Sequence, residues 1–138
     1  LLATDLDTAV LDKAASGIYE MERVEGLDEA RLKRFFMKGK GRQQGKARVR
    51  ANIRELIEFT QLNFHASSWN VKGPFDAIFC RNVLIYFDKP TQYTILKRFV
   101  PLLRPDGLMF AGHSESFLHA ADLFKSQGKT VYTLAGAR

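Results

Sequence analysis

Two polar residues close short β-prone stretches of the sequence, where each could bind a ligand. Asp5 ends the stretch 1–5, and Asn63 follows the stretch 57–62. The carboxylate of Asp5 could accept both hydroxyl protons of a ribose, and the amide of Asn63 could meet an adenine edge with one donor and one acceptor. Two alternatives stay open, because an acid at such a place can cap a helix and an asparagine can close a turn.

A third polar group follows the nearly continuous apolar stretch 75–80. Arg81 and Asn82 come next, and the aromatic segment after them contains Tyr86. Such a run is typical of a strand buried on both faces, and polar groups at its end must face a crevice or find internal partners. Tyr86 could present its hydroxyl to a reacting centre, and a core tyrosine is the equal alternative.

The neighbouring residues His113, Ser114 and Glu115 do not indicate a hydrolase. Adjacent residues cannot form a catalytic triad, and the sequence has no nucleophile elbow. His65, His113 and His119 lack cysteines or acids at the spacing of metal ligands. We therefore predict no metal site.

Strands and helices alternate along the chain. Asp7 or Thr8 can cap a helix that Gly17 ends, and Asp88 can cap a helix over Pro90–Leu103. This alternation predicts an α/β fold with a doubly wound sheet, in which ligands lie beyond the carboxyl ends of the strands. The expected strands are residues 1–5, 57–62, 75–80, 108–111 and 131–134.

The segment 18–54 interrupts this alternation. It contains a candidate helix at 28–36, a polar turn at 39–45 with three glycines, and a short alternating strand that carries Arg48 and Arg50. Residues two apart on a strand project from the same face. We predict an inserted subdomain of one helix and a small antiparallel sheet, with both arginines on one face.

Positive charge is concentrated in the same segment. The chain has a net charge of +6, and residues 31–54 contain ten arginines and lysines and no acid. Such a basic face could attract nucleic acid, an anionic membrane or an acidic protein segment, or could simply be solvated. Because no nucleic-acid recognition motif accompanies the charge, we predict no nucleic-acid partner.

Cysteine usage and hydropathy indicate the cytoplasm. Cys80 is the only cysteine, so no intramolecular disulfide can form, and its place in an apolar run predicts a buried structural thiol. No apolar run reaches the length of a membrane span, and residues 1–3 are too short for a signal peptide. We expect a cytoplasmic protein without direct membrane insertion.

Three long motifs resemble consecutive signatures of the CheR family. They are Ala3–Leu11, Gly73–Asp88 and Leu102–Glu115, and their order and spacing agree over essentially the whole chain. The resemblance implies a Rossmann-like class I methyltransferase domain. It also implies the activity: methyl transfer from S-adenosylmethionine to glutamates of membrane chemoreceptors in chemotaxis adaptation, with S-adenosylhomocysteine as the product.

The resemblance implies a role for each site residue. Arg81 and Tyr86 are the expected catalytic residues, with Tyr86 near the departing methyl group. Because the cofactor is already activated, such an enzyme mainly positions and desolvates the reactants. The expected cofactor-binding residues, from ribose through adenine to the pocket wall, are Asp5, Asn63, Phe64, Arg81 and Asn82.

The basic segment resembles the β-subdomain with which some family members hold the C-terminal tail peptide of a receptor. Gly39, Gly41 and Gly45 reproduce the glycine spacing of that type, and Arg48 and Arg50 would meet acidic groups of a peptide added as a strand. The alternatives are that the glycines only permit a turn and that the arginines cover the sheet with their stems.

The front of the chain departs from the family pattern. Neither the glycine loop that follows the first strand of class I methyltransferases nor the helical N-terminal domain of CheR enzymes is found in residues 1–138. We therefore expect a partial domain whose sheet lacks its first strand, with little activity alone and with self-association through exposed strand edges. The alternative function is a non-catalytic module that tethers receptor tails.

Overall fold

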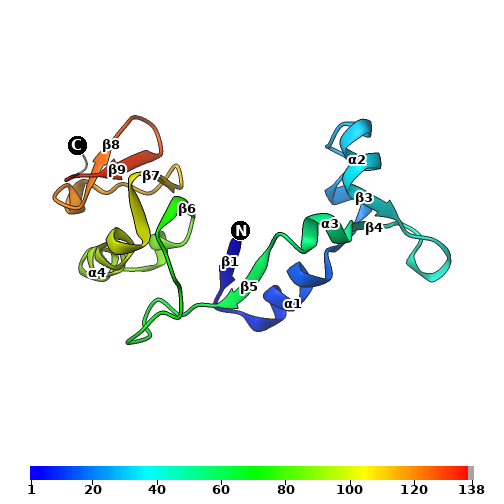
Figure 1. Cartoon of the computed structure of the whole chain (residues 1–138), viewed down its shortest axis with the longest axis horizontal. Coiled ribbons are helices and arrows are strands. Elements are labelled where there is room, and N and C mark those ends of the chain that lie inside the picture. Colours follow the sequence, from blue (N-terminus) through cyan, green and yellow to red (C-terminus); the bar gives the residue numbers. More distant parts are fainter. Residues whose placement is uncertain (137–138) are drawn as a thin grey trace. The chain divides into compact units, whose positions relative to one another are not determined.

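The computed structural model describes residues 1–136, and the chain divides into two compact units. The first unit comprises residues 1–69, and the second begins at Asn70. Figure 1 shows the order of the elements along the chain. None of the helices in the described part is long and apolar enough to cross a membrane.

A parallel pair of strands lies near the two ends of the first unit in the sequence. β1 (Leu2–Asp5) pairs with β5 (Glu58–Gln61), and Asp5 lies opposite Gln61. Both strands were expected from the sequence, and both are confirmed. Because parallel neighbours end at the same edge, the residues that follow β1 and β5 share one edge of this sheet.

Helix α1 (Thr8–Ser16) follows β1 and has the predicted ends. The side chain of Asp7 accepts a hydrogen bond from the backbone N–H of Ala9, which satisfies a donor of the first turn. Gly17 ends the helix in the left-handed region, with φ of 63°, where a residue without a Cβ is favoured.

A three-stranded antiparallel sheet lies between β1 and β5 in the sequence. Its order is β2-β4-β3, so that the last strand of the three is central. A hairpin loop joins β3 to β4. The elements are β2 (Ile18–Glu20), α2 (Glu29–Phe35), β3 (Phe36–Lys38), β4 (Lys46–Val49) and α3 (Ala51–Arg54).

The prediction that Arg48 and Arg50 share a strand is wrong. β4 ends at Val49, and Arg50 is the N-cap residue of α3. The strand stops there because β3, its register partner, begins only at Phe36, opposite Val49. The Arg50 N–H still donates to the Phe35 carbonyl, at 2.8 Å, and the helical turn begins at the next residue. The cation two positions from Arg48 on the same strand is Lys46.

The second unit is built on a four-stranded mixed sheet with the order β6-β7-β9-β8. β6 and β7 are parallel, whereas β9 is antiparallel to both of its neighbours. Buried residues of helix α4 and of the segment after β7 form the core of this unit. The elements are β6 (Phe75–Cys80), α4 (Lys89–Phe99), β7 (Leu103–Ala111), β8 (Phe124–Ser126) and β9 (Val131–Leu134).

Helix α4 is shorter than predicted, and the strand after it is longer. The helix begins at the predicted cap, Asp88, but ends at Phe99 rather than at Leu103. Pro101 explains the difference, because a proline lacks the N–H that an α-helix needs, and the chain continues as the one-turn 3-10 helix Val100–Leu102. β7 then begins at Leu103, five residues earlier than expected.

In residues 1–136 the two faces of β6 are unequally buried, which differs from the burial on both faces that its apolar run predicts. Cys80 is buried, but the neighbouring Phe79, on the opposite face, is 69% exposed. β6 is an outer strand among the described strands of its sheet, and the ring of Phe79 stacks on that of Phe110 on β7, with centroids 4.4 Å apart.

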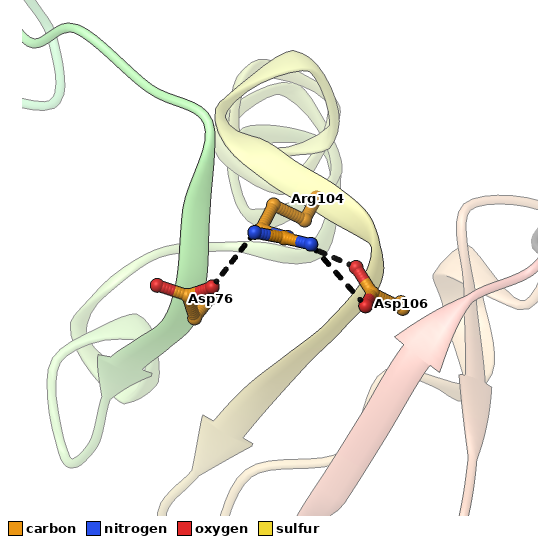
Figure 2. A network of polar contacts seen from close by, with 3 residues as sticks. All are labelled: Asp76, Arg104 and Asp106. Carbon is orange, nitrogen blue, oxygen red and sulfur yellow. Dashed lines mark hydrogen bonds and ion pairs between the residues drawn. The ribbon is translucent and has the colours of Figure 1, made fainter.

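Where β6 and β7 begin, Arg104 forms ion pairs with two acids (Figure 2). Its Nη1 lies 3.2 Å from Asp76 Oδ1, and its Nε lies 3.0 Å from Asp106 Oδ1. The register of β6 and β7 shifts between Phe75 and Ala77, next to these pairs. The α/β class is confirmed, with the described residues distributed over three sheets.

Candidate cofactor and methyl-transfer site

The carboxyl ends of β6 and β7 lie side by side in the second unit. Cys80 and Ala111 are register partners, so the loops that follow them leave the same edge of the sheet. Arg81 crosses this edge, and its Nε donates to the Ala111 carbonyl at 3.2 Å. The polar residues after β6 therefore find partners at the strand ends.

Glu115, in the loop after β7, binds the backbone of the loop after β6. Its side chain is buried, with 8% exposure. Oε1 accepts the N–H groups of Val83, at 3.0 Å, and Leu84, at 2.8 Å. Oε2 accepts those of Asn82, at 3.0 Å, and Gly112. Charged acceptors form strong hydrogen bonds with backbone donors, which offsets the cost of burying the carboxylate.

In the sequence, Glu115 was part of a rejected hydrolase triad and the last residue of a family motif, and its binding of the loop after β6 was not predicted. The available signal was an acid four residues after the end of a strand, with a glycine directly after the strand. A Cβ on Gly112 would lie 2.4 Å from Asn82 Oδ1 and 2.7 Å from Glu115 Oε2. Asn82 itself has a φ of 59°, in the left-handed region that asparagine tolerates better than most residues. Both loops therefore depend on close backbone approach.

Gln92 of α4 holds the other end of the same loop. Its side chain is 7% exposed, and its Nε2 donates to the carbonyls of Leu84 and Phe87, both at 2.9 Å. Lys89 Nζ in turn donates to Gln92 Oε1 at 3.2 Å. The segment 82–87 is thus bound at both ends by buried side chains.

This segment buries one side chain and presents another. Leu84 is 1% exposed, whereas Tyr86, at the end of the one-turn helix Leu84–Tyr86, is 81% exposed. The alternative of a core tyrosine is therefore wrong. An exposed hydroxyl on a constrained turn can meet a ligand or substrate.

Cys80 lies beneath these loops and behaves as the predicted buried thiol. Burial, and to a smaller extent the charge of Glu115, raises the pKa of Cys80 to about 12. A thiol with such a pKa is almost entirely protonated at neutral pH and is a poor nucleophile. Cys80 is therefore a core residue.

The remaining predicted cofactor residues belong to the first unit, at the shared edge of β1 and β5. Asp5 is exposed, and its Oδ1 accepts the Asp7 N–H at 2.9 Å. Asn63 closes a turn, with its Oδ1 accepting the His65 N–H at 2.9 Å. The ring of Phe64 packs against Trp69, with centroids 5.2 Å apart. The turn expected for Asn63 is present.

The hairpin loop favours glycine at three positions for two different reasons, a left-handed backbone and a lack of space for a Cβ. Gly41 and Gly45 have φ values of 58° and 83°, and a Cβ on Gly39 would lie 1.8 Å from the Gln43 carbonyl oxygen. Arg48 is exposed, and its Nε donates to the Ser16 carbonyl at 3.3 Å.

Arg50, just after β4, donates from Nη2 to the Lys33 carbonyl at 3.1 Å. Neither this contact nor that of Arg48 neutralises the arginine, because each acceptor is an uncharged carbonyl. Residues 1–136 contain no group of three or more histidines, cysteines or acids that could hold a metal ion.

Comparison with known proteins connects these loops to a family. Over 135 residues, the chain is 54% identical to chemotaxis protein methyltransferase 2 of Pseudomonas aeruginosa. The aligned region covers 98% of this chain and 48% of that protein. It is 53% identical over 135 residues to chemotaxis protein methyltransferase of Escherichia coli, covering 98% of this chain and 47% of that protein. The chain spans about half the length of these curated relatives.

The family match extends over nearly the whole chain. Residues 1–133 match the family described as CheR methyltransferase, SAM binding domain. S-adenosylmethionine is thus the cofactor that the domain implies, and the three motifs singled out in the sequence lie within the matched residues. The chain belongs to the CheR methyltransferase SAM-binding family.

Proposed function

We propose that this chain is part of a protein-glutamate O-methyltransferase that modifies chemoreceptors. The observation that carries the proposal is the pair of loops at the carboxyl ends of β6 and β7, which present Asn82 and Tyr86 in a chain with the CheR family match. The relatives are named as chemotaxis methyltransferases, which favours an enzyme over the alternative of a tethering module alone.

The complete domain would have a Rossmann-like doubly wound sheet, with residues 18–54 as an inserted β-subdomain. Two parallel strand pairs, β1 with β5 and β6 with β7, support the first part. The antiparallel order β2-β4-β3 supports the second. Residues 1–138 would form part of that methyltransferase domain.

The residues of the first unit fit the nucleoside of S-adenosylmethionine. One carboxylate oxygen of Asp5 accepts the Asp7 N–H, and the other oxygen is available to a ribose hydroxyl. Asn63 uses its Oδ1 within its turn, so its amide N–H groups are the donors for an adenine nitrogen. The ring of Phe64 would supply an apolar contact to adenine.

In the second unit, Arg81 and Asn82 would line the cofactor pocket, and Tyr86 would lie near the methyl group. When bound, the cofactor supplies a methyl group on a sulfonium, which a glutamate carboxylate oxygen accepts as the carbon–sulfur bond breaks and S-adenosylhomocysteine leaves. The protein's contribution is to hold the acceptor carboxylate in line and to exclude water, because positioning can supply a large part of the barrier reduction. Arg81 and Tyr86 would serve this purpose.

Calorimetry and methyl transfer test the proposal together. The full-length protein that carries this sequence should bind S-adenosylhomocysteine and methylate glutamates of a receptor cytoplasmic domain with labelled cofactor. Asp5→Asn keeps an acceptor for the Asp7 N–H but loses a charged oxygen, and should weaken binding by about tenfold. Asp12→Asn, an exposed acid of α1, is the matched control. Full binding by Asp5→Asn would remove Asp5 from the site, and absence of transfer by the unmodified protein would refute the function.

The antiparallel sheet is the proposed binding site for a receptor tail peptide. β2 and β3 are its outer strands, so either could accept an added peptide strand. Arg48 lies on the central strand with Lys46, and Arg50 follows at the start of α3. The glycines 39, 41 and 45 would shape the loop beside the peptide. An acidic tail is the partner that this charge favours.

Self-association stays a prediction. β6 is an outer strand of its sheet, and Phe79 on it is exposed, which are features that favour pairing between chains. Sedimentation of the chain at increasing concentration is the measurement, and a monomer at every concentration would contradict the prediction.

A further inference from the structure

We infer that Glu115 and Gln92 are positioning residues of the methyl-transfer site, because together they hold the segment 82–87 in the conformation that presents Asn82 and Tyr86. The inference deepens the proposed function and rests on it. Neither residue need touch cofactor or substrate, since both are buried behind the loop.

The hydrogen bonds of Glu115 use its whole capacity as an acceptor. An ionised carboxylate has about four lone-pair positions, and four backbone N–H groups donate to Glu115, from Asn82, Val83, Leu84 and Gly112. Three consecutive donors on one segment leave its backbone little freedom to rotate. The carboxylate therefore determines where the Asn82 side chain and the following turn lie.

Gln92 has the complementary chemistry. Its Nε2 donates to two carbonyls of the same segment, those of Leu84 and Phe87, on either side of Tyr86. Glu115 thus binds the donors at the beginning of the segment, and Gln92 binds acceptors at its middle and end. Tyr86 lies between the two Gln92 contacts, which restricts its backbone while its side chain stays exposed.

These roles cannot be exchanged between a carboxylate and an amide. A glutamine at position 115 has the same shape as glutamate, but its NH₂ group would face two backbone N–H donors. A glutamate at position 92 would place an oxygen against two carbonyl oxygens. In a buried site a donor or acceptor without a partner is costly, so the segment should move in either variant.

The experiment compares Glu115→Gln and Gln92→Glu with Phe124→Leu in the full-length protein. Phe124 is a buried residue of β8 that packs on Phe117, so its variant lowers stability without touching the segment 82–87. Three quantities are measured on folded protein: exchange of the amides of Asn82, Val83 and Leu84 by nuclear magnetic resonance, the Kd for S-adenosylhomocysteine, and kcat at saturating cofactor and receptor.

We expect amide exchange in the segment to be at least tenfold faster in Glu115→Gln, with kcat lowered by at least tenfold at saturation. The loss should be in kcat because concentration cannot restore a misplaced Tyr86. Gln92→Glu should also speed amide exchange and lower kcat, but by less. Phe124→Leu should have the kcat and the segment's amide exchange of the unmodified protein.

Unchanged exchange in Glu115→Gln would overturn the inference, because the carboxylate would then not hold the segment. Faster exchange with an unchanged kcat would overturn it too, since the segment's position would not matter to transfer. Absence of transfer by the unmodified protein would refute the proposed function, a result that is distinct from either of these.

Discussion

The loop 82–87 in the second unit and the hairpin loop 39–45 in the first are held in place by different means. Buried Glu115 and Gln92 bind the backbone of the first loop from within. The hairpin loop is held by backbone hydrogen bonds at its ends, such as Gly39 N–H to the Lys46 carbonyl at 2.8 Å. Its residues are otherwise largely exposed.

The difference follows from the proposed tasks of the two loops. A loop that aligns reacting groups benefits from a single conformation, which buried side-chain contacts can specify. A hairpin that receives an extended peptide needs only correct backbone geometry, because main-chain hydrogen bonds supply much of the binding. Changes behind the first loop should therefore affect catalysis, whereas changes within the second should affect peptide binding alone.

The largest expected effect is that of Gly112→Ala. The new Cβ would meet Asn82 Oδ1 and Glu115 Oε2 at distances far below contact, which should displace both loops of the second unit. Overpacking of this kind costs about 1–3 kcal/mol of unfolding free energy. We also expect loss of cofactor binding, measured by calorimetry alongside urea unfolding.

Gly26→Ala is the control for this change, because its Cβ would meet nothing within 4 Å and its φ is not in the left-handed region. Equal unfolding midpoints and equal Kd values for Gly112→Ala and the control would show that the loops do not require the close approach.

Gly39→Ala should weaken peptide binding and leave cofactor binding unchanged, in contrast to Gly112→Ala. Its Cβ would collide with the backbone carbonyl of Gln43, so the hairpin must open. We expect weaker binding of an acidic tail peptide by tenfold or more, about 1.4 kcal/mol, with an unchanged Kd for S-adenosylhomocysteine. Gly41→Ala adds only backbone strain of about 1 kcal/mol. Comparing the two variants distinguishes the effect of the collision from that of strain. A loss of cofactor binding in Gly39→Ala would abolish the distinction between the two loops.

The sequence predicted these two loops unequally well. The glycines indicated the turn at 39–45, and the sequence offered Asp7 or Thr8 for one helix cap and Asp88 for another, because turns and caps depend on neighbours in sequence. The role of Glu115 depends on donors more than thirty residues away, at Asn82 and the two residues after it. A local pattern can place an acid near the end of a strand, but it does not identify the distant donors that the acid binds.

The errors have the same origin. The apolar run of β6 gave the strand but not the exposure of Phe79 within residues 1–136. The alternation around Arg48 gave β4, but its end at Val49 depends on where the partner strand β3 begins, which is not local in sequence. The family could be named in advance from three motifs, whereas the buried contacts of Glu115 and Gln92 could not.

Arg48→Glu is expected to weaken the binding of an acidic tail peptide by about tenfold, since a charge-assisted contact becomes a repulsion. Lys46→Glu should show a smaller effect, because Lys46 already lies 4.0 Å from Glu20. Arg23→Glu, an exposed cation outside this sheet, is the control for net charge. Titration at two salt concentrations measures all three. Equal affinities for Arg48→Glu and Arg23→Glu would remove Arg48 from the peptide site.

Cys80 should make stability depend on pH in alkaline solution. Its pKa is raised to about 12 in the folded protein from an ordinary value of 9.0, so the unfolded chain ionises first. The stabilisation is complete below the unfolded pKa and is lost as the pH rises towards the folded one, by about 1 kcal/mol at pH 10. Urea unfolding of the protein and of Cys80→Ala measures the difference. Parallel pH profiles for the two would contradict it.

The smallest expected effect concerns the exposed ion pairs at the beginning of β6 and β7 (Figure 2). The hydrogen bond and charge of Arg104 lower the pKa of Asp106, so the pair stabilises the protein above the unfolded pKa of an aspartate and loses its effect as the pH falls through the folded one. Water and salt screen the exposed pair, so Asp106→Asn should leave the unfolding midpoint at neutral pH within error. Asp76→Asn, which removes the other partner of Arg104, should behave alike. A marked loss of stability in either variant, with no difference from the unmodified protein in acid, would show that these pairs hold the register shift between the strands. The stability of the second unit would then depend on its surface ion pairs as well as on the buried contacts of Glu115.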